Sequence, residues 1–179
     1  LAFMGALYPA MSAAAARTRA QLPVLLEHAL RVLLLIAGPL AVGIGILAPR
    51  IVDQLYGAAF HASVTPLVLL IASVPFVFAN FPFGYLLNAI DRQTTNTKLI
   101  GIATVVNVAA NIAFIPSFGA TGAALSALIG SAALTALNAV AVHRAIPYRV
   151  RALSVAVFRT AIACLALGIA VQASRNLPL

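Results

Sequence analysis

Long apolar runs separated by short polar segments divide the chain, and each run has the length of a membrane-crossing helix. A helix needs about 20 apolar residues to cross a hydrocarbon core about 30 Å thick. We expect spans at about 30–48, 67–90, 99–115, 120–142 and 152–173. Residues 1–16 are also apolar, and we expect them to be the tail of an earlier span that the start of the chain truncates.

Helices are the expected structure of these runs. Lipid cannot satisfy free backbone groups, and the runs lack the alternating apolar and polar pattern of barrel strands. The sequence therefore predicts an all-α fold, a polytopic transmembrane helix bundle that forms a single domain over residues 1–179.

The composition supports a membrane protein. The hydrophobic residues make up 63% of the 179 positions and the charged residues only 8%. In soluble domains about 45–50% of the residues are apolar and about 25% are charged. The net charge of +8 would suggest a nucleic-acid partner in a soluble chain. Here the basic residues form short clusters without a stripe of interleaved aromatics, so we expect no nucleic acid and instead loops that face anionic membrane lipids.

The basic residues also predict an orientation. Eight of them fall on one side of the predicted spans: Arg17, Arg19, Arg31, Arg92, Lys98, Arg144, Arg149 and Arg151. Arg50 and Arg175 fall on the other side. Because cytoplasmic loops carry the excess of Lys and Arg, the segments 17–31, 91–98 and 143–151 are expected to be cytoplasmic.

Proline interrupts the first two spans. Gly38 and Pro39 lie within the first span, and Pro75 and Pro82 lie within the second. A proline has no amide to bond the carbonyl four residues earlier, so it kinks the helix. Transporters use such breaks as hinges, although passive curvature is the alternative because proline is common in membrane helices.

Several polar side chains lie inside the spans. Asn107 and Asn111 lie four residues apart, on one face of the third span. They are candidates for substrate contact, and hydrogen bonds between helices, worth about 0.6 kcal/mol each, are the alternative. Asn80, Asn88 and Asn138 extend the set and indicate a polar bundle interior.

Small residues recur every four positions in the fourth span. Gly122, Ser126 and Gly130 form a ridge along which another helix can approach closely. We interpret this ridge as a helix-packing surface.

Two arginines are candidates for binding an anionic headgroup. Arg159 lies inside the predicted fifth span, and Arg31 lies at the cytoplasmic end of the first. A charge at membrane depth needs a partner or a water-filled cavity. The alternative is that both side chains extend to the cytoplasmic interface.

The residues that catalysis or metal binding would need are dispersed. Glu27, Asp53 and Asp91 lie apart and outside the spans, so no carboxylate pair for acid and base catalysis is apparent. The three histidines lie in separate polar segments, and Cys164 is the only cysteine. We predict no catalytic residue, no metal site, no cofactor and no enzymatic activity.

The order of several short motifs resembles a known family. Tyr8 to Ser12 (YPAMS) precedes a basic amphipathic stretch, and Leu55-Tyr56-Gly57 with Phe60 follows the first span. The third span, with Asn107 and Asn111, leads into residues 115–124 (IPSFGATGAA). Over about residues 1–150 this layout resembles the C-terminal part of the polysaccharide exporters, the O-antigen and teichoic-acid flippases of the multidrug/oligosaccharidyl-lipid/polysaccharide flippase superfamily.

The resemblance implies a two-lobed protein of the bacterial inner (plasma) membrane that works by alternating access. Its cargo would be an undecaprenyl-pyrophosphate-linked glycan, and the N-terminal lobe of the same chain would be a required partner. A lone C-terminal lobe cannot form the two-lobed cavity, so residues 1–179 are not expected to transport by themselves. A lipid II flippase is the nearest alternative, and a multidrug or cation antiporter of the same superfamily is the next.

Two further alternatives come from other classes. An integral-membrane glycan polymerase would share the compartment and the lipid-linked substrate, but the predicted external loops are too short for a large catalytic loop. A structural membrane subunit is the other alternative, and the polar residues and prolines of the spans disfavour it.

Overall fold

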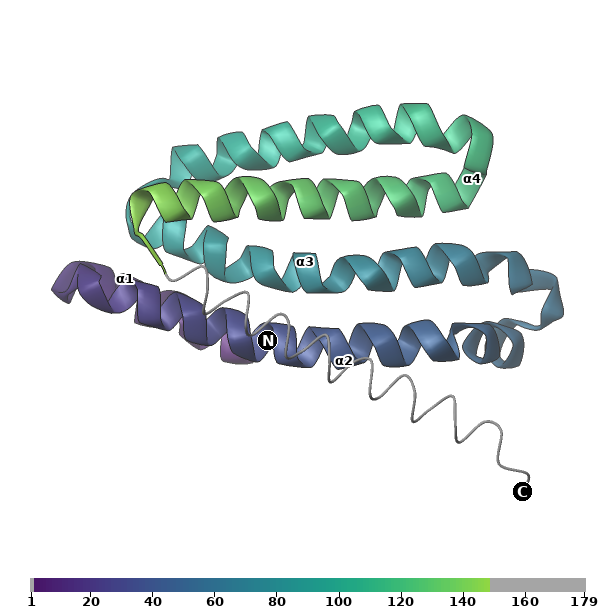
Figure 1. The fold of residues 1–179 in the computed structure, drawn as a ribbon, viewed down its shortest axis with the longest axis horizontal. Coiled ribbons are helices and arrows are strands. Elements are labelled where there is room, and N and C mark those ends of the chain that lie inside the picture. The colour runs from purple at the N-terminus through teal and green to yellow at the C-terminus, as the bar shows by residue number, and fades with distance from the viewer. Residues whose placement is uncertain (1, 149–179) are drawn as a thin grey trace, which may run out of the picture.

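The computed structural model describes residues 2–148, and within this range the chain is a bundle of helices without a strand. The elements are α1 (Ala2–Arg17), the short 3-10 helix η1 (Arg19–Gln21), α2 (Leu22–Tyr56), the 3-10 helix η2 (Ala58–Ser63), α3 (Val64–Ala89) and α4 (Gln93–Ala145). Figure 1 shows the long helices lying roughly side by side, with the chain reversing direction at each link. The predicted all-α fold is confirmed.

The helix α4 is a hairpin of two arms. Its backbone leaves helical geometry at Gly119, where φ is 54° and ψ is −128°. A side chain at this combination would clash with the backbone, so the position is restricted to glycine. The two arms, residues 93–118 and 120–145, run antiparallel next to each other (Figure 1). The predicted spans 99–115 and 120–142 fall one on each arm.

Among residues 2–148, three helical segments are long and apolar enough to cross a membrane: Arg19–Tyr56, Ala58–Ala89 and Gln93–Ala145. The helix α2 has 35 residues and extends beyond the predicted span 30–48 at both ends. Its first turns carry Glu27, His28 and Arg31, which lower the local hydropathy without breaking the helix. The predicted span 67–90 falls on α3, except for Ile90 just after it. The predicted span 152–173, with Arg159, lies outside the described residues.

The buried core lies where α1, α2, α3 and the end of α4 meet. Its fully buried large side chains come from all four helices: Met11, Leu22, Leu26, Leu30, Phe83, Leu86, Leu87 and Val142. In contrast, large apolar side chains on α2 and on the first arm of α4 are exposed, such as Leu35 at 60%, Val105 at 68% and Ile112 at 72%. A soluble monomer rarely exposes so much apolar surface, whereas lipid chains solvate it.

The two ends of the bundle differ in charge. The α1–α2 link, the α3–α4 link and the end of α4 meet at one end (Figure 1), and they carry Arg17, Arg19, Arg92 and Arg144. The sequence predicts that these segments share one membrane face. As far as the structure describes them, they lie at the same end of the bundle.

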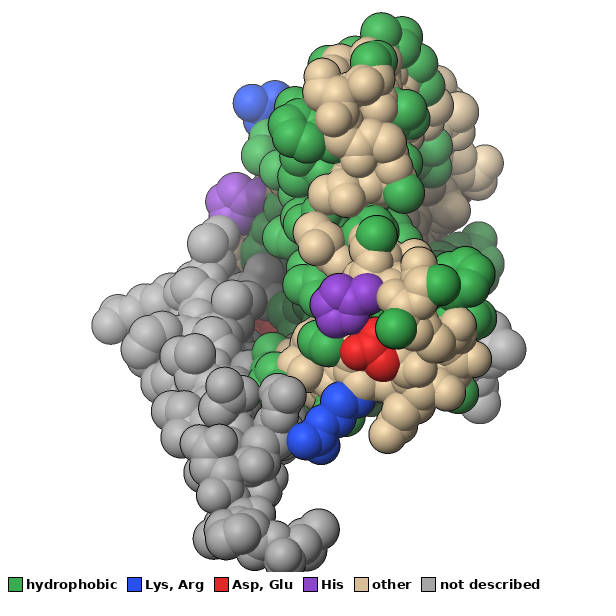
Figure 2. Space-filling model, turned by 90° about the vertical axis from the view of Figure 1, so that its right-hand side faces the viewer, with side chains coloured by type: hydrophobic (Ala, Val, Ile, Leu, Met, Phe, Trp, Pro, Cys, Tyr) green, Lys and Arg blue, Asp and Glu red, His purple; other side chains and the backbone are tan. Residues whose placement is uncertain are grey.

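The opposite end carries the α2–α3 link and the bend of α4. Figure 2 shows this end, where a few charged side chains lie among apolar groups and backbone. There the Nδ1 atom of His61 lies 2.9 Å from a carboxylate oxygen of Asp53, and both side chains are exposed. Exposed pairs of this kind contribute about 0–1 kcal/mol, so this pair is a minor contributor to the fold.

Candidate functional site

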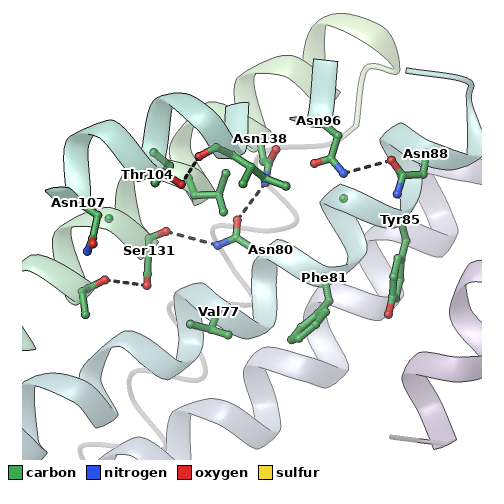
Figure 3. Close-up of a pocket in the computed structure, with 16 residues that line it drawn as sticks. Val77, Asn80, Phe81, Tyr85, Asn88, Asn96, Thr104, Asn107, Ser131 and Asn138 are labelled. Carbon is green, nitrogen blue, oxygen red and sulfur yellow. Dashed lines mark hydrogen bonds between the residues drawn. The ribbon is translucent and has the colours of Figure 1, made fainter. Parts of the chain in front are cut away.

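A polar pocket lies between α3 and the two arms of α4. Its volume is about 540 Å³, which is in the usual range for small-molecule sites. Its polar lining residues are shown in Figure 3: Asn80, Asn88, Asn96, Thr104, Asn107, Ser131 and Asn138. Phe81 and Tyr85 of α3 also line it. The pocket therefore combines neutral hydrogen-bonding groups with aromatic rings.

Asn80 and Asn138 connect α3 to the second arm of α4. The Nδ2 group of Asn138 donates to the Oδ1 atom of Asn80 at 3.1 Å, and the Nδ2 group of Asn80 makes a long contact of 3.5 Å with the carbonyl of Ser131 (Figure 3). Asn138 is only 2% exposed. Its own Oδ1 atom is buried and finds no donor among the described residues. An unpaired buried acceptor is unfavourable, and a water or a hydroxyl can pair with this oxygen only if the pocket wall moves, because the atom itself is inaccessible.

A second pair of asparagines spans the α3–α4 link. The Nδ2 group of Asn96 donates to the Oδ1 atom of Asn88 at 3.1 Å. Asn96 also lies beside Gly84, where an added Cβ would be 3.6 Å from its Nδ2 atom. These contacts hold the Asn96 side chain against α3, so the first turn of α4 contributes to the pocket.

Asn107 connects the two arms of α4, and Asn111 bonds to Asn107 from the same arm. The Nδ2 group of Asn107 donates to the carbonyl of Ser126 at 2.8 Å, and the Nδ2 group of Asn111 donates to the Oδ1 atom of Asn107 at 3.0 Å. Asn107 lines the pocket. The bond of Asn107 runs between the arms, as expected of the alternative to substrate contact, whereas the bond of Asn111 stays within the first arm.

The ridge of small residues faces the first arm of α4. Gly122, Ser126 and Gly130 are all buried. A Cβ added at Gly122 would lie 2.6 Å from the carbonyl carbon of Phe114, and one added at Gly130 would lie 2.9 Å from the Cβ of Asn107. The arms approach each other so closely that side chains at these two positions would overlap the neighbouring arm.

No charged side chain of residues 2–148 lines the polar pocket. Arg31 is exposed on α2 and is not among the lining residues, and Arg159 lies outside the described residues. Within the described range, no three His, Cys, Asp or Glu side chains come together in a way that would hold a metal ion. The arrangement is suited to binding neutral polar groups, such as sugar hydroxyls and amides, rather than to chemical catalysis.

The four predicted hinge residues all lie inside continuous helices. Gly38 and Pro39 are half-buried within α2, and Pro75 and Pro82 lie within α3. The two prolines of α3 flank the segment that brings Val77, Asn80 and Phe81 to the pocket. A change in the bend of α3 would therefore move pocket residues, whereas α2 contributes none of the lining side chains.

The sequence patterns did not reveal every pocket residue. Asn96 lies in the segment 91–98, which the sequence predicts to be a cytoplasmic link, but α4 begins at Gln93 and the Asn96 side chain contacts α3. Thr104 and Ser131 are common residues in membrane helices and gave no distinct signal. The closest available signal for Asn96 was its position with Asn88 on either side of a short link.

Comparison with known proteins identifies the family. The family model described as Lipid II flippase MurJ matches residues 1–176. No curated protein and no solved structure gave a match. The expected membership of the flippase superfamily is confirmed, but the matched family is the one named for lipid II and not the O-antigen and teichoic-acid type. Together with the long apolar helices, the match shows a multi-pass membrane protein that is a transporter of lipid-linked precursors and not an enzyme. The chain belongs to the lipid II flippase MurJ family.

Proposed function

We propose that this chain is part of a flippase that moves lipid II from the cytoplasmic to the outer leaflet of the bacterial inner membrane. The match of the lipid II flippase family over residues 1–176 carries this proposal. The cargo is an undecaprenyl-pyrophosphate-linked glycan, and the segments 17–31, 91–98 and 143–151 face the cytoplasm.

The polar pocket provides a physical reason for such a cargo. The headgroup of a lipid-linked precursor carries sugar hydroxyls and amides, which must lose water when they cross the bilayer. Neutral amides such as those of Asn80 and Asn138 can replace those hydrogen bonds without the large desolvation penalty of a charge. The pocket thus supports a role in accommodating the uncharged part of the headgroup during transport.

The pyrophosphate would be bound by other groups. Arg31 and Arg159 remain our candidates, and the N-terminal lobe is a further source of basic side chains. Arg31 is exposed on α2 and does not line the polar pocket. A pyrophosphate bound by Arg31 would therefore lie outside this pocket, on the side of α2.

Transport in proteoliposomes tests the proposed cargo. The gene product that contains residues 1–179 is reconstituted with fluorescent lipid II, and the fraction accessible to an external quencher is followed in time. We expect lipid II to cross faster than in protein-free vesicles and faster than an undecaprenyl-pyrophosphate-linked oligosaccharide without a peptide. Equal or faster movement of the oligosaccharide would instead favour a polysaccharide exporter.

The hinge hypothesis makes a separate prediction about α3. In Pro75→Ala the new amide can bond the carbonyl of Ile71, so α3 becomes straighter and stiffer just before its pocket residues. We expect lipid II transport to slow by about threefold to tenfold, which corresponds to about 0.7–1.4 kcal/mol in the barrier. The initial transport rate at equal protein density measures this effect.

Pro49→Ala is the matched control for Pro75→Ala. It adds an amide to the interior of α2, a helix that does not line the pocket. Unchanged rates in both variants would show that the bend of α3 is passive, and an equal loss in both would show that the effect does not depend on the pocket.

A further inference from the structure

A second pocket lies at the basic end of the bundle, separate from the polar pocket. Its volume is about 320 Å³, and it is lined by three segments that are distant in the sequence. Arg19 comes from η1, Ile90 and Arg92 come from the α3–α4 link, and Ile146 and Pro147 follow α4. The two pockets share no lining residue.

Short links with backbone hydrogen bonds bring the two arginines to this pocket. Thr18 is extended, with φ −152° and ψ 97°, and it separates α1 from η1 so that the chain turns at Arg19. The amide of Arg92 donates to the carbonyl of Leu87 at 2.8 Å, and the carbonyl of Arg92 accepts from the amide of Asn96 at 3.1 Å. The backbone of Arg92 is thus tied to both α3 and α4, which fixes the point from which its guanidinium extends.

The charge of this pocket is unbalanced. Arg19 and Arg92 both line it, and within the part of the chain that the structure describes no acidic side chain does so. Asp91 is adjacent in sequence, but it adopts a positive φ of 60° and is not a lining residue. Two guanidinium groups around one small cavity repel each other unless an anion lies between them.

The remaining lining groups are apolar. Pro23, Ile90, Ile146 and Pro147 surround the two arginines. A free phosphate would gain nothing from these side chains, whereas a phospholipid places its glycerol and first methylenes beside its phosphate. The segments that line the pocket lie at one end of the helix bundle (Figure 1), which is the depth of the headgroups for helices that cross a membrane.

We propose that this pocket binds the phosphate of an anionic phospholipid headgroup through Arg19 and Arg92. Guanidinium groups bind phosphate oxygens through paired, charge-assisted hydrogen bonds. A bound lipid would connect the α1–α2 link to the α3–α4 link and stabilise this end of the bundle. The site does not depend on the cargo of the transporter or on which membrane face this end occupies, since both leaflets contain headgroups.

Lipid titration of the purified gene product in neutral detergent tests the proposal. Native mass spectrometry gives the affinity for phosphatidylglycerol, for zwitterionic phosphatidylcholine and for inorganic phosphate alone. In the wild type we expect phosphatidylglycerol to bind more tightly than phosphatidylcholine. The double variant R19Q/R92Q is expected to weaken phosphatidylglycerol binding by about tenfold or more, because each basic residue near an anionic headgroup contributes substantially.

The matched control is R17Q/R144Q. It removes the same net charge from exposed residues at the same end, and neither residue lines the pocket. We expect it to change the affinity by less than about twofold. The variant R19K/R92K keeps both charges but loses the paired guanidinium geometry, so we expect its affinity to lie between those of the wild type and R19Q/R92Q. Circular dichroism of R19Q/R92Q, expected to match the wild type, separates a loss of binding from misfolding.

Three results would overturn the proposal. Equal losses in R19Q/R92Q and R17Q/R144Q would mean that only the overall surface charge attracts the lipid. Equal affinity of the wild type for both phospholipids would remove the role of the anionic headgroup. Inorganic phosphate that competes fully with phosphatidylglycerol at similar concentration would assign the pocket to a free anion.

Discussion

Replacing Gly122 by alanine is expected to lower the free energy of unfolding by about 2 kcal/mol or more, as overpacking of a tight interior does. The added Cβ would lie 2.6 Å from the carbonyl carbon of Phe114 and 2.9 Å from the amide nitrogen of Ile115. These are backbone atoms of the opposite arm of α4, and they cannot rotate away as a side chain can. The arms must separate, which also weakens the hydrogen bond from Asn107 to the carbonyl of Ser126.

Denaturant unfolding in detergent, followed by circular dichroism, measures this loss. Gly101→Ala is the control, because Gly101 lies on the first arm of α4 and an added Cβ there meets nothing within 4 Å. Alanine is the better helix former by about 0.5–1 kcal/mol, so this variant should be as stable as the wild type or more stable. If Gly122→Ala were as stable as the wild type, the two arms could not lie as close together as the structure places them.

The second large effect is expected in transport when Asn138 is replaced by leucine. The change removes the donor to the Oδ1 atom of Asn80 and the buried acceptor that has no partner among the described residues. It also places a branched apolar group in the pocket wall. Leaving a buried polar group without its partner costs about 1–3 kcal/mol, so we expect the rate of lipid II transport to fall at least about tenfold.

Gln93→Leu is the control for this experiment. It replaces an amide by the same apolar side chain in the same helix, but Gln93 is exposed and does not line the pocket. Both variants are compared in proteoliposomes at equal protein density, with helicity checked by circular dichroism. Transport at the wild-type rate in Asn138→Leu would exclude a role of the polar pocket in moving the cargo.

The helices could be predicted from the sequence because few other structures satisfy the backbone in lipid. Hydropathy located the centres of α2, α3 and the two arms of α4. It located the ends less well, since polar residues such as Glu27 and Arg31 continue α2 without any break in backbone geometry. Hydropathy reports the apolar part of a helix, whereas hydrogen bonding decides where the helix ends.

The polar interior was also predictable in outline. An asparagine inside an apolar span must face protein or water, which correctly grouped Asn80 with Asn138. The hydrogen-bond partner of each asparagine was not predictable, because it depends on how three helical segments are placed around one another. Asn107 illustrates this point, since its amide binds the carbonyl of Ser126 on the opposite arm, a contact that no spacing in the sequence reveals.

The cargo was the least predictable property. The motifs around Pro9 and residues 115–124 indicated the superfamily, whose branches share the same helix layout. The pocket lining consists of amides, hydroxyls and aromatic rings, and these groups bind many neutral headgroups. The branch was therefore identified by the match of residues 1–176 to a family and not by any single residue.

The single-residue reversal at Gly119 has a consequence for how the protein is made. A translocon that releases helices into the bilayer one by one would expose Asn107 to lipid until the carbonyl of Ser126 arrives on the second arm. The bend and the turn before it, residues 116–119, carry no charge that would hold them in water on the far side. The two arms of α4 should therefore leave the translocon together, as one helical hairpin, and a nascent chain that ends near Gly119 should not yet be stably integrated.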